Sequence, residues 1–311
     1  MAFSVFIDGA AGTTGLEIRE RLAGRKEFSL VVLEGEKRKE AAARAEALNS
    51  ANFAILCLPD EAAKEAVALI DPASTVRVID ASSAHRVADG WTYGFPELIG
   101  REEVANARLV SNPGCYPTGF LGLVVPLVRA GLLPASWPLS VNAVSGYSGG
   151  GNALIDRFKA EPAIAYRAYG LAMGHKHLRE MQTYAGLEHA PVFAPAVVPT
   201  HRGMLVEVPL QLSALPSSAS VEAVHETIAT AYADTGKVVT VQPLGTAPAE
   251  ILLATDNAPW DGLELSVFGS ADGTQARLFA RLDNLGKGAS GAAVQNLNLM
   301  AGLPETAGLQ L

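Results

Sequence analysis

The sequence predicts an α/β protein, with a Rossmann-like dinucleotide-binding domain followed by an α+β catalytic domain on a mainly antiparallel sheet. Three observations predict this fold. Apolar runs alternate with helical patterns in the first part of the chain, as in βαβ units with a parallel sheet. A glycine-rich loop follows the first apolar run. Later strand-like runs include a hairpin signal at Asp272 and Gly273.

The first part of the chain supplies strands and helices in alternation. Strand-like runs lie at residues 2–7, 28–33, 53–59 and 75–80. Helical patterns separate them at residues 14–24, 39–48 and 61–70. Because parallel neighbours need a crossover that is usually a helix, this order favours a parallel sheet.

The second part changes character. Strand-like runs lie at residues 192–198, 204–212, 237–244, 263–270 and 276–283, with a helix at 220–233. A final helical pattern at 286–303 is expected to return to the first domain. The expected division is a dinucleotide-binding domain at residues 1–117, a catalytic and dimerisation domain at 118–284, and a returning C-terminal helix at 285–311.

Composition limits the partners. The chain has 311 residues, which suits two domains of roughly 150 residues. Its formal charge of -8 argues against a nucleic-acid or anionic-membrane surface. No secretory signal and no membrane-spanning apolar run is recognised, so we expect a cytoplasmic protein with small-molecule partners and two reduced cysteines.

The loop after the first strand indicates a nucleotide site. Against the GxGxxG fingerprint, Ala10 occupies the first glycine position, while Gly12 and Gly15 match. Thr14 and Glu17 have the spacing of a capping box, so we expect backbone amides at the helix start to face a phosphate. The cofactor-binding candidates are Gly9, Ala10, Gly12, Thr13, Thr14 and Gly15.

The two cysteines have different surroundings. Cys57 lies in an apolar run and is interpreted as a small buried hydrophobe. Cys115 lies between prolines in "SNPGCYPTG", and Pro117 suits the first turn of a helix. A thiol at a helix N-terminus is stabilised as its thiolate, so Cys115 is the predicted nucleophile.

Five motifs give the chain a family resemblance: "GAAGTTGLEI", "SNPGCYPTG", "VSGYSGGG", "GHKHLREM" and "DNLGKGASGAAVQN". With them it closely resembles the N-acetyl-gamma-glutamyl-phosphate reductases of arginine biosynthesis, in their shorter form. The resemblance implies reductive dephosphorylation of an acyl phosphate by NADPH, which gives N-acetylglutamate semialdehyde, with Cys115 as covalent nucleophile. It also implies cofactor contacts at Ser148, Gly149 and Asn284. One departure is Arg179, where the family's HxHxPE pattern has proline.

NADP is the expected cofactor, although the sequence carries two signals. Glu34 stands where an acidic side chain commonly binds the ribose hydroxyls of NAD. Lys37, Arg38 and Lys39 follow, and a cation there would pair with the additional phosphate of NADP. The resemblance favours NADP, and Arg38 is the preferred contact because a guanidinium can bind two phosphate oxygens.

Histidines and Asn112 are candidates for the groups around the nucleophile. His175 and His177 precede or begin a helical pattern that contains Glu180, and His175 is preferred as base and later acid. Asn112 is a candidate oxyanion helper beside the amides at the Cys115 helix start. His85 and His201 each neighbour an arginine, but solvent-facing loops are slightly preferred for both.

Arginines suit an anionic substrate. Arg86 and Ser82, after a predicted strand, are candidates for the acyl phosphate, and Arg202 is a second arginine candidate. No metal site is expected. A homo-oligomer, either dimer or tetramer, is expected because wide antiparallel sheets often pair subunits.

Three other functions remain open at this stage. Aspartate-semialdehyde dehydrogenase shares the thioester chemistry but takes a shorter substrate that lacks the N-acetyl group. A cysteine hydrolase would need no nucleotide loop. A Rossmann binding module with a sensory thiol would bind dinucleotide without phosphate-dependent turnover.

Overall fold

The computed structural model describes residues 2–216, 219–246 and 248–311. The chain forms two compact units. Unit 1 contains residues 1–114 and 289–309, and unit 2 contains residues 115–288 and 310–311. These divisions fall three residues before and four residues after the expected positions, 117 and 284.

Unit 1 is built on a six-stranded sheet in which every pairing is parallel. The strand order is β2-β1-β3-β4-β6-β5. The strands are β1 (Phe3–Asp8), β2 (Phe28–Val31), β3 (Phe53–Leu56), β4 (Arg77–Asp80), β5 (Thr92–Tyr93) and β6 (Leu109–Ser111). The order reverses beside β1, which is the topological switch point where such sheets bind ligands.

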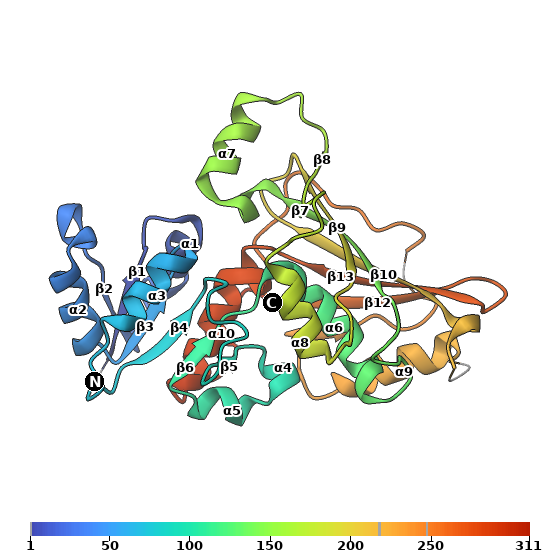
Figure 1. Cartoon of the computed structure of the whole chain (residues 1–311), viewed down its shortest axis with the longest axis horizontal. Helices are drawn as coiled ribbons and strands as arrows, with labels where there is room; N and C mark the ends of the chain where they lie inside the picture. Colours follow the sequence, from blue (N-terminus) through green and yellow to red (C-terminus); the bar gives the residue numbers. More distant parts are fainter. Residues whose placement is uncertain (1, 217–218, 247) are drawn as a thin grey trace. The chain divides into compact units, whose positions relative to one another are not determined.

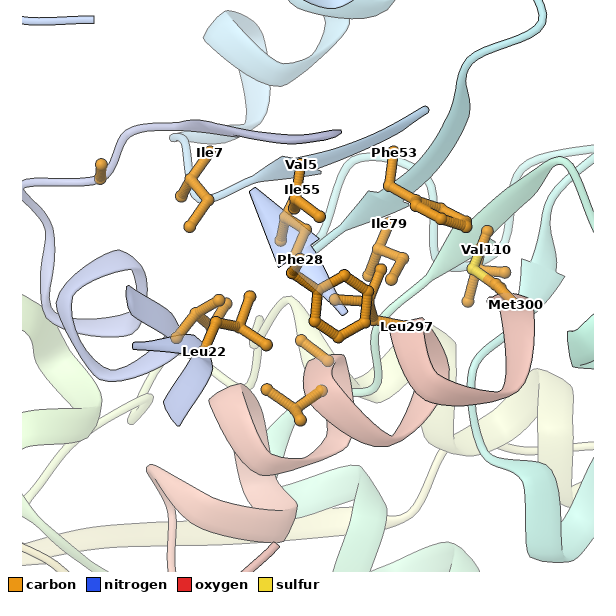
Figure 2. Close-up of a cluster of buried hydrophobic side chains, with 14 of the residues drawn as sticks. Val5, Ile7, Leu22, Phe28, Phe53, Ile55, Ile79, Val110, Leu297 and Met300 are labelled. Carbon is orange, nitrogen blue, oxygen red and sulfur yellow. The ribbon is translucent and has the colours of Figure 1, made fainter. Parts of the chain in front are cut away.

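Helices pack on both faces of the unit 1 sheet. They are α1 (Thr13–Leu22), η1 (Gly35–Lys39), α2 (Ala41–Ser50), α3 (Asp60–Ala68), α4 (Pro96–Ile99), α5 (Arg101–Asn106) and α10 (Gly291–Met300). On one face, Ile18 of α1 and Leu297 of α10 join a cluster with Val5 and Ile55 of the sheet, as Figure 2 shows for the cluster as a whole. On the other face, α2 and α3 cover a second cluster. Burial on both faces explains the continuous apolar strands of this part of the sequence.

Unit 2 is built on a seven-stranded sheet of order β11-β12-β13-β10-β7-β9-β8. Figure 1 labels β7, β8, β9, β10, β12 and β13 of this sheet. The strands are β7 (Ser140–Gly146), β8 (Arg167–Ala168), β9 (Val192–Val198), β10 (Met204–Gln211), β11 (Val239–Val241), β12 (Leu263–Gly269) and β13 (Gln275–Leu282). The helices are α6 (Cys115–Arg129), η2 (Tyr147–Gly150), α7 (Gly151–Ala160), α8 (His177–Ala185), η3 (Leu212–Ala214) and α9 (Val221–Ala231). A π-helical turn, η4 (Gly286–Ser290), precedes α10.

The prediction of a mainly antiparallel second sheet is confirmed only in part, because the sheet is mixed. β10 pairs antiparallel with β7 and β13, and β12 with β13 forms the predicted hairpin, where Gly273 has a φ of 69°. β7 pairs parallel with β9, however, and β11 pairs parallel with β12. Long connections join both parallel pairs, so their strands can return in the same direction.

Helix α6 is the buried helix of unit 2 and packs on its sheet. A Cβ atom at Gly119 would meet Val206 of β10 at 2.8 Å, and one at Gly122 would meet Leu263 of β12 at 3.0 Å. These two glycines therefore allow a close approach of helix and sheet. That approach fixes the position of Cys115, the first residue of α6.

Candidate active site

A cavity of about 450 Å³ opens in unit 1 where β1 meets α1. The glycine-rich loop, the segment after β2 and the end of β3 line it. Residues on its wall include Gly9, Ala10, Gly12, Arg19, Glu34, Arg38, Lys39 and Cys57. The cavity therefore lies at the carboxyl end of parallel strands, which is where dinucleotides bind in this fold.

Two glycines of the loop are required by the backbone. Gly9 has a φ of 84°, and a Cβ atom there would overlap the Cys57 carbonyl group. A Cβ atom at Gly15 would meet the Cα atom of Ala10 at 2.8 Å. Gly9 thus takes a conformation that other residues rarely adopt, and Gly15 permits close packing of α1 against the loop.

The capping-box prediction at Thr14 and Glu17 is wrong. Helix α1 begins at Thr13, and its N-cap residue is Gly12, which has no side chain that could accept a capping hydrogen bond. Thr14 lies within the first turn, and the Glu17 carboxylate forms an ion pair with Arg21. The amides at the helix start therefore receive no side-chain cap from the N-cap residue.

The acidic side chain that favours NAD and the basic side chains that favour NADP both occur on the cavity wall. Glu34 and Arg38 line it together, and Lys39 is also on its wall. Lys37 belongs to the same short helix, η1, but is not among the lining residues. Arg19 of α1 adds a cation that the sequence reasoning missed, because its spacing belongs to the solvent face of a helix as well as to a site.

Cys115 begins α6, as the sequence predicted. Gly288 of η4 packs against it, because a Cβ atom at Gly288 would meet the Cβ atom of Cys115 at 2.8 Å. Helix α6 has 15 residues, so its amide dipoles favour negative charge at the Cys115 end. Gly288 was not predicted, and its only signal was membership of a glycine-rich motif.

Aromatic rings gather beside Cys115. The Tyr116 ring lies 6.2 Å from the His175 ring and 5.8 Å from the His177 ring. Tyr169 lies 5.6 Å from His175, and its hydroxyl donates to the Tyr116 hydroxyl at 3.3 Å. Burial raises the pKa of Tyr169 to about 12, and negative charge on the nearby Cys115 adds to that rise. Sequence reasoning missed Tyr169, which a separate segment of the chain brings to the site.

The two candidate histidines differ in accessibility and hydrogen bonding. His175 is half-buried, whereas His177 is buried as the first residue of α8. The backbone N–H of His177 donates to Nδ1 of His175 at 3.1 Å. Since Nδ1 accepts this bond, the neutral His175 ring carries its proton on Nε2. In that form His175 offers Nε2–H as a hydrogen-bond donor, and its role as base and later acid stays a prediction.

The structure brings together three residues predicted to contact the cofactor. The Asn284 amide donates to the Ser148 hydroxyl at 2.8 Å and accepts from the backbone N–H of Gly203 at 2.9 Å. Gly149 packs close to the same amide. The glycines of the motif "VSGYSGGG" fall at the end of β7, in the short helix η2 and at the start of α7.

Arg202, a predicted substrate residue, lies beside this group. Its guanidinium forms an ion pair with Asp283 at 3.1 Å. Burial raises the pKa of the Asp283 carboxyl group, and Arg202 opposes that rise. Arg202 is therefore fixed near Asn284 by a neighbouring carboxylate.

The other predicted substrate residues meet in unit 1. Arg86 is 7% exposed, and its guanidinium donates to the backbone carbonyl groups of Asn112 at 3.0 Å and Ala81 at 3.3 Å. The Asn112 amide donates to the Ala289 carbonyl group and accepts from Asn296. The hydrogen bond from Arg86 to Asn112 connects the loop after β4 to the segment that follows β6.

Within the part of the chain that the structure describes, no group of three or more His, Cys, Asp or Glu is placed to hold a metal ion. Among the described residues, no helix has the length and apolar character needed to cross a membrane.

Comparison with known proteins defines the class. Residues 4–107 match the family model "Semialdehyde dehydrogenase, NAD binding domain", and residues 115–284 match "Semialdehyde dehydrogenase, dimerisation domain". An aspartate semialdehyde dehydrogenase II structure from Vibrio cholerae has a TM-score of 0.68 at 18% identity, covering 96% of this chain and 98% of that one. The fold is therefore that of the semialdehyde dehydrogenases.

Closer relatives define the family. An N-acetyl-gamma-glutamyl-phosphate reductase 2 from Nostoc sp. is 50% identical, with 98% of each chain covered. An N-acetyl-gamma-glutamyl-phosphate reductase from Burkholderia cenocepacia is 51% identical, covering 96% of this chain and 97% of the relative. The chain belongs to the N-acetyl-gamma-glutamyl-phosphate reductase family, as the sequence motifs predicted.

Proposed function

We propose that this protein reduces N-acetyl-gamma-glutamyl phosphate to N-acetyl-L-glutamate 5-semialdehyde and phosphate in arginine biosynthesis, through a thioester on Cys115. The observation that carries the proposal is Cys115 at the start of α6, beside the rings of Tyr116, Tyr169 and His175. The cavity beside the glycine-rich loop of unit 1 and the relatives of the same family support it.

Cys115 accounts for the first bond changes. Its thiolate attacks the acyl carbon, the carbon–oxygen bond to phosphate breaks, and a thioester remains. The bound nicotinamide cofactor supplies a hydride to the thioester carbon. Collapse of the resulting thiohemiacetal breaks the carbon–sulfur bond, and Cys115 returns to its thiolate as the aldehyde leaves.

His175 has a defined task in this scheme. Negative charge develops on the acyl oxygen in both addition steps, so a donor aimed at it accelerates both. Because Nδ1 of His175 accepts from the His177 amide, Nε2–H is the donor that His175 offers. A neutral imidazole can serve as such a donor. Aromatic neighbours at 5.1 Å and 5.6 Å help hold its ring.

NADP is the proposed cofactor. Arg38 and Lys39 on the cavity wall support it, because two cations there can compensate the charge of an additional phosphate. Contacts of Ser148, Gly149 and Asn284 with the nicotinamide end are part of the same proposal, supported by their mutual hydrogen bonds.

We further propose that the protein forms a homo-oligomer and works in the cytoplasm. The dimerisation-domain match over residues 115–284 supports association of subunits. A reducing compartment would keep the Cys115 thiol available for catalysis.

The reverse reaction tests the function. Purified enzyme is given NADP, phosphate and either N-acetylglutamate semialdehyde or aspartate semialdehyde, and NADPH formation is followed by absorbance. We expect phosphate-dependent turnover with the N-acetylated aldehyde and far lower kcat/KM with the other. A higher kcat/KM with aspartate semialdehyde would instead assign the chain aspartate-semialdehyde dehydrogenase activity, which is the activity in the name of its structural neighbour.

A further inference from the structure

Two consecutive residues of unit 2, Asp283 and Asn284, follow β13 and hold the turn that contains Arg202. The Asp283 carboxylate pairs with the Arg202 guanidinium at 3.1 Å. The Asn284 side chain accepts from the backbone N–H of Gly203 at 2.9 Å. The side chain and the backbone of this turn are therefore both held by one short segment of the chain.

The backbone carbonyl oxygen of Arg202 is also held. It accepts from the Asn257 amide at 3.0 Å and from the Thr200 hydroxyl at 3.1 Å. Gly203 has a φ of 106°, which other residues rarely adopt, and a Cβ atom there would meet the Asn257 amide at 2.7 Å. Because the backbone is fixed, the direction of the Arg202 side chain depends on the partner of its guanidinium, Asp283.

The Asp283 carboxylate is buried and is itself held from two sides. Its Oδ1 accepts from the backbone N–H of Leu285 at 2.9 Å. Its Oδ2 accepts from the Arg202 guanidinium, and the N–H of Trp260 lies 3.4 Å from the same oxygen. One carboxylate oxygen thus holds the turn after β13, and the other orients the guanidinium.

The same turn contacts the nucleophile. The backbone N–H groups of Gly286 and Gly288 both donate to the Asp283 carbonyl oxygen at 3.0 Å. A Cβ atom at Gly288 would lie 3.0 Å from that oxygen and 2.8 Å from the Cβ atom of Cys115. Asp283 and Cys115 are therefore close neighbours within unit 2, so the guanidinium that Asp283 orients belongs to the surroundings of the nucleophile.

The proposed substrate gives such a guanidinium a task. N-acetylglutamate carries a carboxylate at the end of its carbon chain opposite the reacting acyl group. A guanidinium binds a carboxylate through two parallel N–H groups, so its plane must be oriented correctly. An arginine whose direction is fixed beside Cys115 can hold that carboxylate while the acyl carbon is attacked.

We infer that Asp283 is a positioning residue that orients the Arg202 guanidinium toward the carboxylate of the substrate. This inference rests on the proposed function. Asp283 acts through Arg202 rather than on the reacting atoms. Its loss should therefore weaken binding of the substrate, which raises KM, and should change kcat far less.

Asp283→Asn tests the inference in the reverse reaction, where the carboxylate and the phosphate enter on different molecules. Asparagine keeps an oxygen for the Leu285 N–H but presents its amide N–H groups to Arg202, which loses its partner. We expect KM for N-acetylglutamate semialdehyde to rise by about tenfold, while kcat and KM for phosphate stay within about threefold. Asp283→Glu moves the carboxylate by one methylene group and should raise the same KM, so it replaces Asp283→Asn if that variant does not fold.

A double-mutant cycle separates positioning from a general role in the fold. Arg202→Ala alone should raise KM for the aldehyde by about 10-fold to 100-fold. Adding Asp283→Asn to Arg202→Ala should change that KM no further, because no guanidinium is left to orient. Glu264→Gln is the matched control, since Glu264 is also the partner of an arginine in unit 2, Arg281, at 3.0 Å. It should leave KM for the aldehyde and for phosphate unchanged.

Two results would overturn the inference in the single variants. One is an unchanged KM for the aldehyde, and the other is a rise confined to KM for phosphate, which would assign Arg202 to the other anion. Additive effects of Asp283→Asn and Arg202→Ala would also overturn it, because Asp283 would then act independently of Arg202. A wild-type enzyme without phosphate-dependent turnover of the aldehyde would instead refute the proposed function.

Discussion

The surroundings of the two cysteines differ although each cysteine lies against a glycine. Gly9 packs on the carbonyl group of Cys57, and Gly288 packs on the Cβ atom of Cys115. Cys57 follows β3, and burial together with the charges of Asp80 and Asp8 raises the pKa of its thiol to about 12. Cys115 begins a long helix, where the backbone favours negative charge. The same type of side chain therefore lines a cavity at Cys57 and is the proposed nucleophile at Cys115.

Replacing the nucleophile should give the largest effect. Cys115→Ser is expected to abolish turnover, because a serine hydroxyl at the same helix start stays protonated and forms no thioester. NADPH binding, measured by fluorescence titration, should persist because the cofactor cavity lies in unit 1. Near-normal turnover in Cys115→Ser would show that Cys115 is not the nucleophile, so the two cysteines would not differ in catalytic role.

His175 should give the next effect. We expect His175→Ala to lower kcat by about 100-fold to 1,000-fold, as loss of an oxyanion donor does. His175→Gln keeps an N–H donor and should recover most of that loss. His177→Asn should be milder than His175→Ala. A Gln variant as inactive as the Ala variant would restore the role of base to His175.

Gly9→Ala tests the close contact between Gly9 and the Cys57 carbonyl group. The new methyl group would overlap the Cys57 carbonyl group, and the φ of 84° is costly for alanine. We expect a loss of about 3 kcal/mol of unfolding free energy and weaker NADPH binding, since strained backbone alone costs roughly 1–3 kcal/mol. Gly24→Ala is the control, with a φ of 76° and nothing within 4 Å. Equal losses in both variants, measured by urea unfolding, would show that the contact with Cys57 is unimportant.

Arg38→Ala tests how the unit 1 cavity, whose wall includes Cys57, distinguishes NADPH from NADH. The ratio of kcat/KM for NADPH over NADH should fall by about tenfold, chiefly through a higher KM for NADPH, because a charge-assisted hydrogen bond contributes roughly 1.5–3 kcal/mol. Lys37→Ala, on the same short helix but off the cavity wall, should leave the ratio unchanged. An unchanged ratio in Arg38→Ala would assign the selectivity to Lys39 or Glu34.

Cys57 should give the smallest effect. Burial raises its pKa to about 12, so the thiol stays protonated at pH 8 and should resist iodoacetamide. Peptide mapping should then find the label on Cys115. Because the unfolded chain ionises Cys57 first, this residue's contribution to stability is present below pH 9 and is lost as pH rises toward 12. Cys57→Ser should keep turnover within about twofold, because serine is close to cysteine in size and Cys57 takes no part in the proposed covalent steps. Faster labelling of Cys57 than of Cys115 would reverse the comparison.

The sequence by itself determined the local features of this protein. Alternating patterns located β1 to β4 and α1 to α3 of unit 1 but not β5, β6, α4 or α5, and the turn residues around Cys115 located the start of α6. The N-acetyl-gamma-glutamyl-phosphate reductase family was also evident from motifs. These features depend on neighbours in the chain, because periodicity and turn chemistry act over a few residues.

Only the tertiary structure decided which distant residues meet. It paired β7 with β9 in parallel, brought Tyr169 to His175, and packed Gly288 on Cys115. It also placed the side chain of the loop residue His85, which was expected to face solvent, against the buried Asp80. Hydrogen-bond partners and close backbone contacts arise from packing between segments far apart in sequence. A single sequence carries no local signal for them, so the hydrogen-bond partners of His85 and His175 emerged only from the tertiary contacts.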